Sequence, residues 1–289
     1  MDSAILSLLG AFLLSIMGLF VFIWSMRKGL LVENPRAASV IFAPGELGKV
    51  DDPAIHGNQG KPQDRLPGAE PLPGETEHVA NPDELRHRIE ADHSTAFPVF
   101  MFIAFACFWL LLGSAAGLTA SLKLHMPDWM VGEAWQTFGR IRTVHLTAVL
   151  YGWITNAALG VIIWLLPRLL RTHLVGAMWV MLGGALINTG IASAIGAIGS
   201  GWTDGMEYLE IPWQIGIFIV AGFICIIGPV LYTLVNRKVE SLYVSVWYMV
   251  AALLWIALLF IIGKLPGVHT GVQQATTNWW YGHNVLGLW

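Results

Sequence analysis

The sequence predicts an all-α membrane protein, and three observations carry this prediction. Only 12% of its 289 residues are charged, against roughly 25% in soluble domains. The apolar residues collect in runs of about 20, each long enough for a helix to cross a hydrocarbon core of roughly 30 Å. No stretch alternates polar and apolar residues as the strands of a membrane barrel do. These features exclude a cytoplasmic enzyme, a nucleic-acid-binding protein and a secreted domain held by disulfides.

Six complete apolar spans and the start of a seventh follow one another along the chain. Inside a bilayer the backbone must satisfy its own hydrogen bonds, so each span is expected to be a helix. The complete spans lie near residues 4–24, 97–119, 144–166, 174–199, 212–234 and 242–262, and the seventh begins near Trp279. That last helix would hold about 11 residues and measure only some 16 Å. We therefore expect a truncated or split gene product.

Pairs of basic residues indicate the orientation. They follow the first, third and fifth spans, and the positive-inside rule places such pairs in the cytoplasm. The pairs are Arg27 and Lys28, Arg168 and Arg171, and Arg237 and Lys238. The amino terminus and the loops 120–143, 200–211 and 263–278 then lie outside. We expect a multi-pass protein of the bacterial inner membrane with a periplasmic amino terminus.

The part of the chain before the main bundle has two regions. Residues 1–24 have no basic residue ahead of the apolar run and no cleavage site behind it, so we expect an uncleaved transmembrane anchor. Residues 25–96 hold eight prolines, many glycines and acidic residues, which predicts a solvated cytoplasmic linker. A short helix is expected near residues 81–92, with Asn81 as its N-cap and Pro82 at its first position. Residues 97–289 form the main, incomplete bundle.

The segment TFGRIRTVHLTAVLYGW places His145 just inside the hydrocarbon. An ionisable side chain there is costly, which makes it a functional hypothesis. Arg142 lies three residues earlier on the same face, and Ala148 and Gly152 continue that face with small side chains. This combination suits a haem, with His145 as an axial ligand and Arg140 and Arg142 beside the propionates. A histidine that hydrogen-bonds between helices is the alternative, and spacing alone does not separate the two.

The segment NWWYGHNVLGLW places His283 at a similar depth in the seventh span, three and four residues after Trp280 and Trp279. The tryptophans are typical of an interfacial belt. The imidazole is either a polar residue of the first helical turns or one ligand of a metal, and imidazole suits several metals. A single histidine does not decide between copper and the structural alternative.

The loop GWTDGMEYLEIPW carries Asp204, Glu207 and Glu210 on the side predicted to be outside. Three carboxylates within seven residues could ligate a hard cation such as calcium. Their spacing is not that of an EF-hand, and a solvated acidic loop is the alternative. Cys107 and Cys225 lie in apolar spans without a metal-binding spacing, so they are interpreted as packing residues.

These three segments resemble the catalytic subunit of the cbb(3)-type cytochrome c oxidases, the C family of haem–copper oxidases. FGRIRTVH is similar to that family's FGR-x-R-x-x-H helix, whose histidine ligates the low-spin haem b. WWYGHN is similar to the segment whose histidine is the first copper ligand, and MEYLE to a periplasmic loop that helps to hold calcium near the propionates. The resemblance covers the amino-terminal part of that subunit. It implies that His145 ligates haem b, that His283 ligates copper, and that Glu207, rather than Glu210, is the better calcium ligand.

Two further features concern relatives. Aerobic oxidases of other families carry a tyrosine four residues beyond the copper histidine, and nitric oxide reductases carry a glutamate. This chain has Gly287 there, as the cbb(3) type does, whose essential tyrosine comes from a later helix. Residues 1–50, with IWSMRKGLLVENPRAASVIF, resemble the one-helix assembly protein of the cbb(3) oxidases.

The resemblance implies a terminal oxidase that reduces oxygen to water and translocates protons. Electrons would come from cytochrome c through haem c-carrying subunits to haem b, then to a high-spin haem b and copper. The remaining ligands and the proton path would belong to the remaining oxidase helices, so we expect no catalytic residue here beyond the metal ligands, and no activity of the isolated chain. A non-catalytic membrane fragment or assembly-related protein is the alternative function, and a nitric oxide reductase relative is a weaker one. The partners expected are membrane lipid and oxidase subunits, and no nucleic acid.

Overall fold

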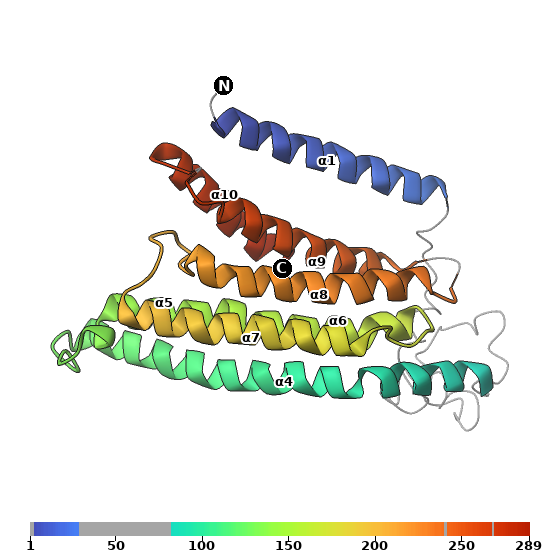
Figure 1. The fold of residues 1–289 in the computed structure, drawn as a ribbon, viewed down its shortest axis with the longest axis horizontal. Helices are drawn as coiled ribbons and strands as arrows, with labels where there is room; N and C mark the ends of the chain where they lie inside the picture. The colour runs from blue at the N-terminus through green and yellow to red at the C-terminus, as the bar shows by residue number, and fades with distance from the viewer. Residues whose placement is uncertain (1–2, 29–81, 240–241, 268) are drawn as a thin grey trace, which may run out of the picture.

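The computed structural model describes residues 3–28, 82–239, 242–267 and 269–289, and Figure 1 shows how its helices are arranged. The regular elements in these ranges are all helices, which confirms the predicted all-α class. Their axes run roughly side by side, as in a bundle that crosses a bilayer (Figure 1).

Five helices in the described residues are long and apolar enough to cross a membrane. They are α4 (Pro82–His125), the rod formed by α5 (Phe138–Thr147), η4 (Ala148–Ile154) and α6 (Thr155–Leu169), then α7 (Ala177–Ser200), α8 (Trp213–Val235) and α9 (Val244–Gly263). A short 3-10 turn, η3 (Ala134–Gln136), precedes the rod. These helices lie over the second to sixth spans that the sequence predicts. The first predicted span lies within α1 (Ser3–Arg27), whose part Ile16–Arg27 is a shorter apolar helix.

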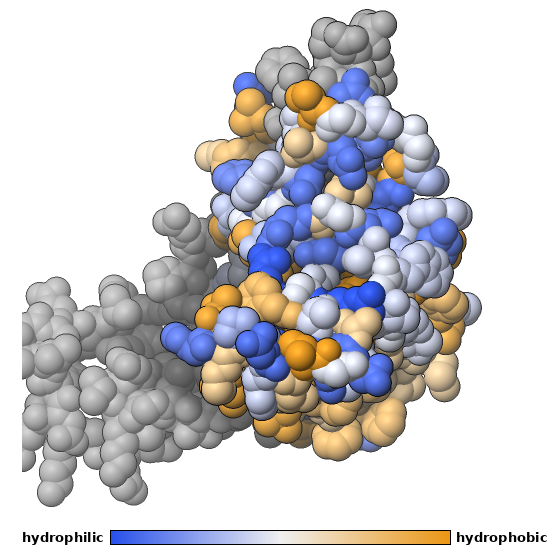
Figure 2. All heavy atoms as spheres, turned by 90° about the vertical axis from the view of Figure 1, so that its left-hand side faces the viewer, coloured by the Kyte–Doolittle hydropathy of each residue, from blue (hydrophilic) through white to orange (hydrophobic). Residues whose placement is uncertain are grey.

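The helices pack on one another in layers. α4 packs against α5, η4 and α6, and α7 packs along α8. α10 (Val272–Leu288) packs on α9, and α1 lies beyond α10 at the edge of the stack (Figure 1). One end of the bundle carries the loops 126–137, 201–212 and 264–271. Figure 2 looks onto this end, where hydrophilic residues gather above a rim of hydrophobic ones.

The helix expected near residues 81–92 is not separate from the span that follows it. α4 runs for 44 residues and continues through Pro98. Tertiary contacts hold the chain helical ahead of this proline: Ser94 Oγ accepts a hydrogen bond of 2.8 Å from the backbone of Leu174, and Asp92 pairs with Arg168. The predicted N-cap Asn81, and residues 29–81 of the predicted linker, lie outside the described residues.

The last helix begins earlier than the apolar run indicates. α10 starts at Val272 rather than near Trp279, after Gly271 with a positive φ of 57°. Gln273, Gln274 and Ala275 near its start are good helix formers, although they are not part of the apolar run. With 17 residues it measures about 25 Å, so the expectation of about 11 residues and some 16 Å was wrong.

A buried polar cluster joins α4, α6 and α7 within the membrane span. Trp109 Nε1 donates to Asn188 Oδ1 at 2.7 Å. Asn188 and Asn156 exchange side-chain hydrogen bonds of 2.9 and 3.1 Å. All three residues are buried, with Trp109 only 4% exposed. Lipid offers these polar side chains no hydrogen bonds, so they must bond to one another. The cluster therefore fixes the rotation of the three helices about their axes.

We predict that Asn188→Leu lowers the free energy of unfolding by about 1–2 kcal/mol, because it leaves the Trp109 and Asn156 donors without their partner. Denaturation by sodium dodecyl sulfate in detergent micelles would measure the loss. Asn236→Leu is the control, because Asn236 is exposed at the end of α8 and its side chain donates to the carbonyl of Tyr232 in its own helix. Equal losses in the two variants would contradict the role of the cluster.

Candidate functional site

His145 is anchored through one ring nitrogen. It lies in α5, and its Nδ1 is 2.8 Å from the carbonyl oxygen of Gly113 in α4. A carbonyl only accepts hydrogen bonds, so Nδ1 carries the proton and Nε2 keeps its lone pair. Histidines that ligate metals commonly donate their other nitrogen to a carbonyl in this way. The arrangement presents Nε2 as the nitrogen that can ligate a metal.

Two glycines of α4 make this contact possible. A Cβ on Gly117 would lie 2.7 Å from His145 Nδ1, and a Cβ on Gly113 would lie 2.9 Å from a methyl group of Val149. Only glycine permits the imidazole to lie this close to α4. The two positions form a G-xxx-G pattern in the sequence GSAAG, which is typical of close helix packing in membranes.

The small residues after His145 also serve the contact with α4. Ala148 is fully buried, and a Cβ on Gly152 would lie 2.6 Å from Trp109. The small side chains on this face predicted space for a macrocycle. In the structure α4 fills it, and the small side chains let the indole of Trp109 pack against the rod.

The rod widens into a π-helix directly after α5. η4 covers Ala148–Ile154, and such segments often occur at functional sites. Thr155 Oγ1 donates to the carbonyl of Leu150, five residues back, at 3.0 Å. The same hydroxyl accepts a hydrogen bond of 2.9 Å from Trp289 Nε1. Tyr151 lies within this π-helix and is buried, with only 3% of it exposed.

The predicted arginines lie at the polar end of the bundle. Arg142 Nη2 is 2.5 Å from Glu207 Oε1, and the two side chains are 42% and 39% exposed. Arg140 Nη1 donates to the carbonyl of Gly199, at the end of α7, at 2.9 Å. The sequence predicts Arg142 beside a propionate and Glu207 as a calcium ligand. In the structure these two residues pair with each other.

The loop 201–212 is a junction between several helices. The backbone N–H of Glu207 donates to Asn278 Oδ1 at 3.0 Å, and Asn278 Nδ2 donates to the carbonyl of Glu207 at 2.6 Å. Lys264 pairs with Asp204 at 2.7 Å and also donates to the carbonyl of Leu209. The loop therefore connects α5, α9 and α10.

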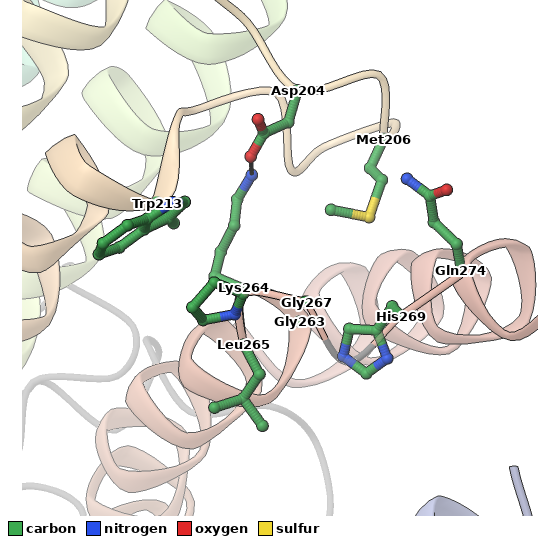
Figure 3. Close-up of a pocket in the computed structure, with 10 residues that line it drawn as sticks. Asp204, Met206, Trp213, Gly263, Lys264, Leu265, Gly267, His269 and Gln274 are labelled. Atoms are coloured by element: carbon green, nitrogen blue, oxygen red, sulfur yellow. Dashed lines mark hydrogen bonds and ion pairs between the residues drawn. The ribbon is translucent and has the colours of Figure 1, made fainter. Parts of the chain in front are cut away.

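The three carboxylates of this loop have different partners. Asp204 faces Lys264, Glu207 faces Arg142, and Glu210 is buried with 7% exposed. Within the described residues no three His, Cys, Asp or Glu side chains gather where they could share a metal. A cavity of about 230 Å³ lies beside the Asp204–Lys264 pair (Figure 3). Its lining includes His269 and neither His145 nor His283.

Burial shifts the titration of two groups at this end. It raises the pKa of the Glu210 carboxyl above its ordinary value near 4.5, against the backbone N–H groups of Glu210 and Tyr208 and the charge of Arg142, which lower it. Burial lowers the pKa of Lys264, which the hydrogen bond and charge of Asp204 partly oppose. Glu210 thus holds its proton to a higher pH in the folded loop than in the unfolded chain.

We predict that the loop 201–212 loosens as the pH rises from 4.5. Because the folded pKa of Glu210 is raised, its contribution to stability is complete below the unfolded value and is lost as the pH passes through the folded value. Glu210→Gln removes this dependence. Hydrogen exchange of the loop amides, compared between wild type and variant at the same pH, measures it. A wild-type to variant ratio that stays constant from pH 4.5 to 8 would count against the prediction.

His283 lies on the exposed face of α10. Trp279 and Leu286 share this face and are 71% and 61% exposed, whereas Tyr281 and Val285 on the opposite face are buried against the bundle. His283 itself is exposed and makes no hydrogen bond within the described part of the chain. Its imidazole is thus available to a ligand or to further helices.

The fold defines a multi-pass helical membrane protein. Two of its helices, α5 and α10, carry the candidate ligands His145 and His283. The family described as Cytochrome C and Quinol oxidase polypeptide I matches residues 98–289, and the chain belongs to this family. The match covers the bundle from α4 to the end of α10.

Curated relatives agree with this assignment. The chain is 29% identical over 194 residues to a "Cytochrome c oxidase subunit 1 homolog" of Agrobacterium tumefaciens, covering 63% of this chain and 35% of that protein. It is 28% identical over 198 residues to "Cytochrome c oxidase subunit 1" of Rhodobacter capsulatus, covering 63% and 37%. It is 28% identical over 210 residues to the "Cbb3-type cytochrome c oxidase subunit CcoN1" of Stutzerimonas stutzeri, covering 68% and 44%. The chain therefore spans less than half the length of these relatives.

Several residues of this region were not predicted from the sequence. Gly113 and Gly117 were visible as a G-xxx-G pattern, but nothing in the sequence paired them with His145, 32 residues after Gly113. The hydrogen bond at the end of the π-helix comes from Trp289, which lies 134 residues away from Thr155. The sequence does not distinguish Tyr151 from the other aromatic residues of its apolar span.

Proposed function

We propose that this chain is the amino-terminal part of the catalytic subunit of a cbb(3)-type cytochrome c oxidase, in which His145 is an axial ligand of haem b. The family assignment and the relative from Stutzerimonas stutzeri support the type of oxidase. The single observation that carries the site is the hydrogen bond from His145 Nδ1 to Gly113 O, which leaves Nε2 for iron.

The residues present fit such a group. Nε2 of His145 is the unprotonated nitrogen, and Arg142 and Arg140 lie three and five residues before it, where the rod reaches the polar end. Arg142 is half-exposed in its pair with Glu207, so it can neutralise a propionate. The haem, when bound, supplies the electron transfer, while the protein orients it and sets its potential.

His283 is proposed as one ligand of the copper beside a high-spin haem b. Its imidazole is exposed on α10, and one histidine needs further ligands to bind a metal tightly. Those ligands, the second ligand of haem b and the proton path would come from the helices that complete the subunit. Glu207, with Glu210 as the weaker candidate, is proposed to help hold calcium near the propionates.

The assembled enzyme would take electrons from cytochrome c through haem c-carrying subunits and reduce oxygen to water, coupled to proton translocation. It would lie in the bacterial inner membrane with the loop 201–212 and the amino terminus in the periplasm. Residues 1–24 would form an anchor, and residues 25–96 would lie on the cytoplasmic side, with residues 82–96 as the first part of α4. The resemblance of residues 1–50 to an assembly protein favours a maturation role for this part.

The test is oxygen uptake by the oxidase assembled from this chain and its completing segments, with reduced cytochrome c as the donor. His283→Ala should reduce uptake to the background while the haem b spectrum persists. His173→Ala is the control, since His173 is exposed between α6 and α7, at the other end of the bundle. Uptake that survives in His283→Ala would contradict the copper assignment. Reduction of nitric oxide in place of oxygen would assign the chain to that reductase instead, and neither activity would favour a non-catalytic role.

A further inference from the structure

Hydrogen bonds between tyrosine hydroxyls link the rod that carries His145 to the helix that carries His283. Tyr151 in η4 donates to the carbonyl of Tyr208. Its hydroxyl oxygen also lies 2.5 Å from the hydroxyl of Tyr281 in α10. A hydroxyl has one proton, and that of Tyr151 is used on the carbonyl. Tyr281 therefore donates to Tyr151, and the hydrogen-bonded link runs from Tyr281 through Tyr151 to the backbone of Tyr208.

The hydrogen-bonded tyrosines Tyr151 and Tyr281 are buried. Tyr281 is fully buried and Tyr151 is 3% exposed. The ring of Phe260 in α9 packs edge-on against Tyr151, with ring centroids 5.9 Å apart. A Cβ on Gly263 would lie 3.3 Å from the ring of Tyr281. Each hydroxyl bond is thus made in an apolar site, where an unpaired polar group is costly.

Tyr208, the third residue of this link, has an uncommon backbone conformation. Tyr208 has a φ of 62°, a left-handed region that non-glycine residues rarely adopt. Its carbonyl accepts from Tyr151, and a Cβ on Gly282 would lie 3.4 Å from its ring. The loop is therefore fixed on both sides, by η4 through the carbonyl and by α10 through the ring. Strain of this kind persists where the surroundings over-determine it.

We propose that Tyr151 is a positioning residue whose hydroxyl fixes α10, and with it His283, relative to the rod that carries His145. This inference rests on the proposed function, because it concerns the two candidate ligands. Tyr281 lies two residues before His283, and Tyr151 lies six residues after His145. A shift of either helix at the link would move an imidazole relative to the other.

Hydrogen exchange of the full chain in lipid nanodiscs tests the link without any bound cofactor. Tyr281→Phe removes only the bond between the tyrosines, and Tyr151→Phe also removes the bond to the loop. We expect Tyr281→Phe to speed exchange in α10, and Tyr151→Phe to speed it in both α10 and residues 201–212, by about fivefold for each bond lost. Tyr248→Phe is the control, because Tyr248 is 72% exposed on α9. Exchange in Tyr151→Phe that equals the control would overturn the proposal.

The midpoint potential of haem b in the assembled subunit tests the positioning role itself. Tyr151→Phe should shift this potential, and Tyr248→Phe should not. A haem b signal whose potential is the same in Tyr151→Phe and wild type would overturn positioning and leave the proposed function intact. A wild-type subunit without any haem signal that depends on His145 would overturn the proposed function, and the positioning of ligands with it.

Discussion

Gly117→Ala is expected to weaken haem b binding about 10- to 100-fold, the range found when a partner of a metal-ligating histidine is removed. The new methyl group would lie 2.7 Å from His145 Nδ1 and 2.8 Å from Cε1, so the ring must move. Moving the ring breaks its hydrogen bond to Gly113 O, and both the tautomer and the direction of Nε2 are then no longer fixed. The haem content per subunit, from the reduced-minus-oxidised spectrum, measures the effect.

Gly196→Ala is the matched control for this substitution. Gly196 lies in α7, and a Cβ there would meet no atom within 4 Å, so this variant should keep its haem. The contact with α4 would be unimportant for the ligand if Gly117→Ala held haem as well as Gly196→Ala does. A loss in both variants would point to a general effect of alanine on folding.

Arg168→Met is expected to have the largest effect on stability, with a loss of about 2–3 kcal/mol in the free energy of unfolding. The guanidinium is 7% exposed and makes bonds of 2.6 and 2.8 Å to the two carboxylate oxygens of Asp92. It also stacks on Trp164, 4.7 Å from the ring centroid. Asp92 is 41% exposed, so water partly relieves its lost partner and keeps the loss below that of a fully buried pair.

The contact joins α4 to the end of α6, and its strength can be isolated. A double-mutant cycle of Arg168→Met with Asp92→Asn should show a coupling of about 1–3 kcal/mol. Arg86→Met provides the comparison, because Arg86 and Glu90 form an exposed pair at 3.7 Å within one helix, where such pairs contribute about 0.3–0.5 kcal/mol. A coupling near zero would mean that Arg168 acts through its contact with Trp164.

The sequence was sufficient for the class and for the position of the long helices, because an apolar run in a bilayer has no other way to satisfy its backbone. It was insufficient where distant residues decide local structure. A boundary was expected between residues 96 and 97, yet α4 passes through it and through Pro98, since Ser94 and Asp92 are held by the chain near Leu174 and Arg168. α10 begins seven residues before its apolar run, with the good helix formers Gln273, Gln274 and Ala275 in its first turns.

The candidate site shows the same division. The sequence singled out His145 because an ionisable group within an apolar span is rare, and it singled out Arg142 through helical spacing. The pairing of Arg142 with Glu207 spans 65 residues, and no local pattern contains it. The link from Tyr151 to Tyr281 spans 130 residues and depends on a π-helix, which shifts the face that a regular helix would present. Such contacts can be identified only when the fold is known.

The reduced-minus-oxidised spectrum of the assembled subunit with His145→Gly tests whether Nε2 of His145 ligates haem b. We predict that the b-type signal disappears in this variant and returns when free imidazole is added, because imidazole can occupy the space that the side chain left. A full haem b signal in His145→Gly without added imidazole would show that His145 is not the ligand.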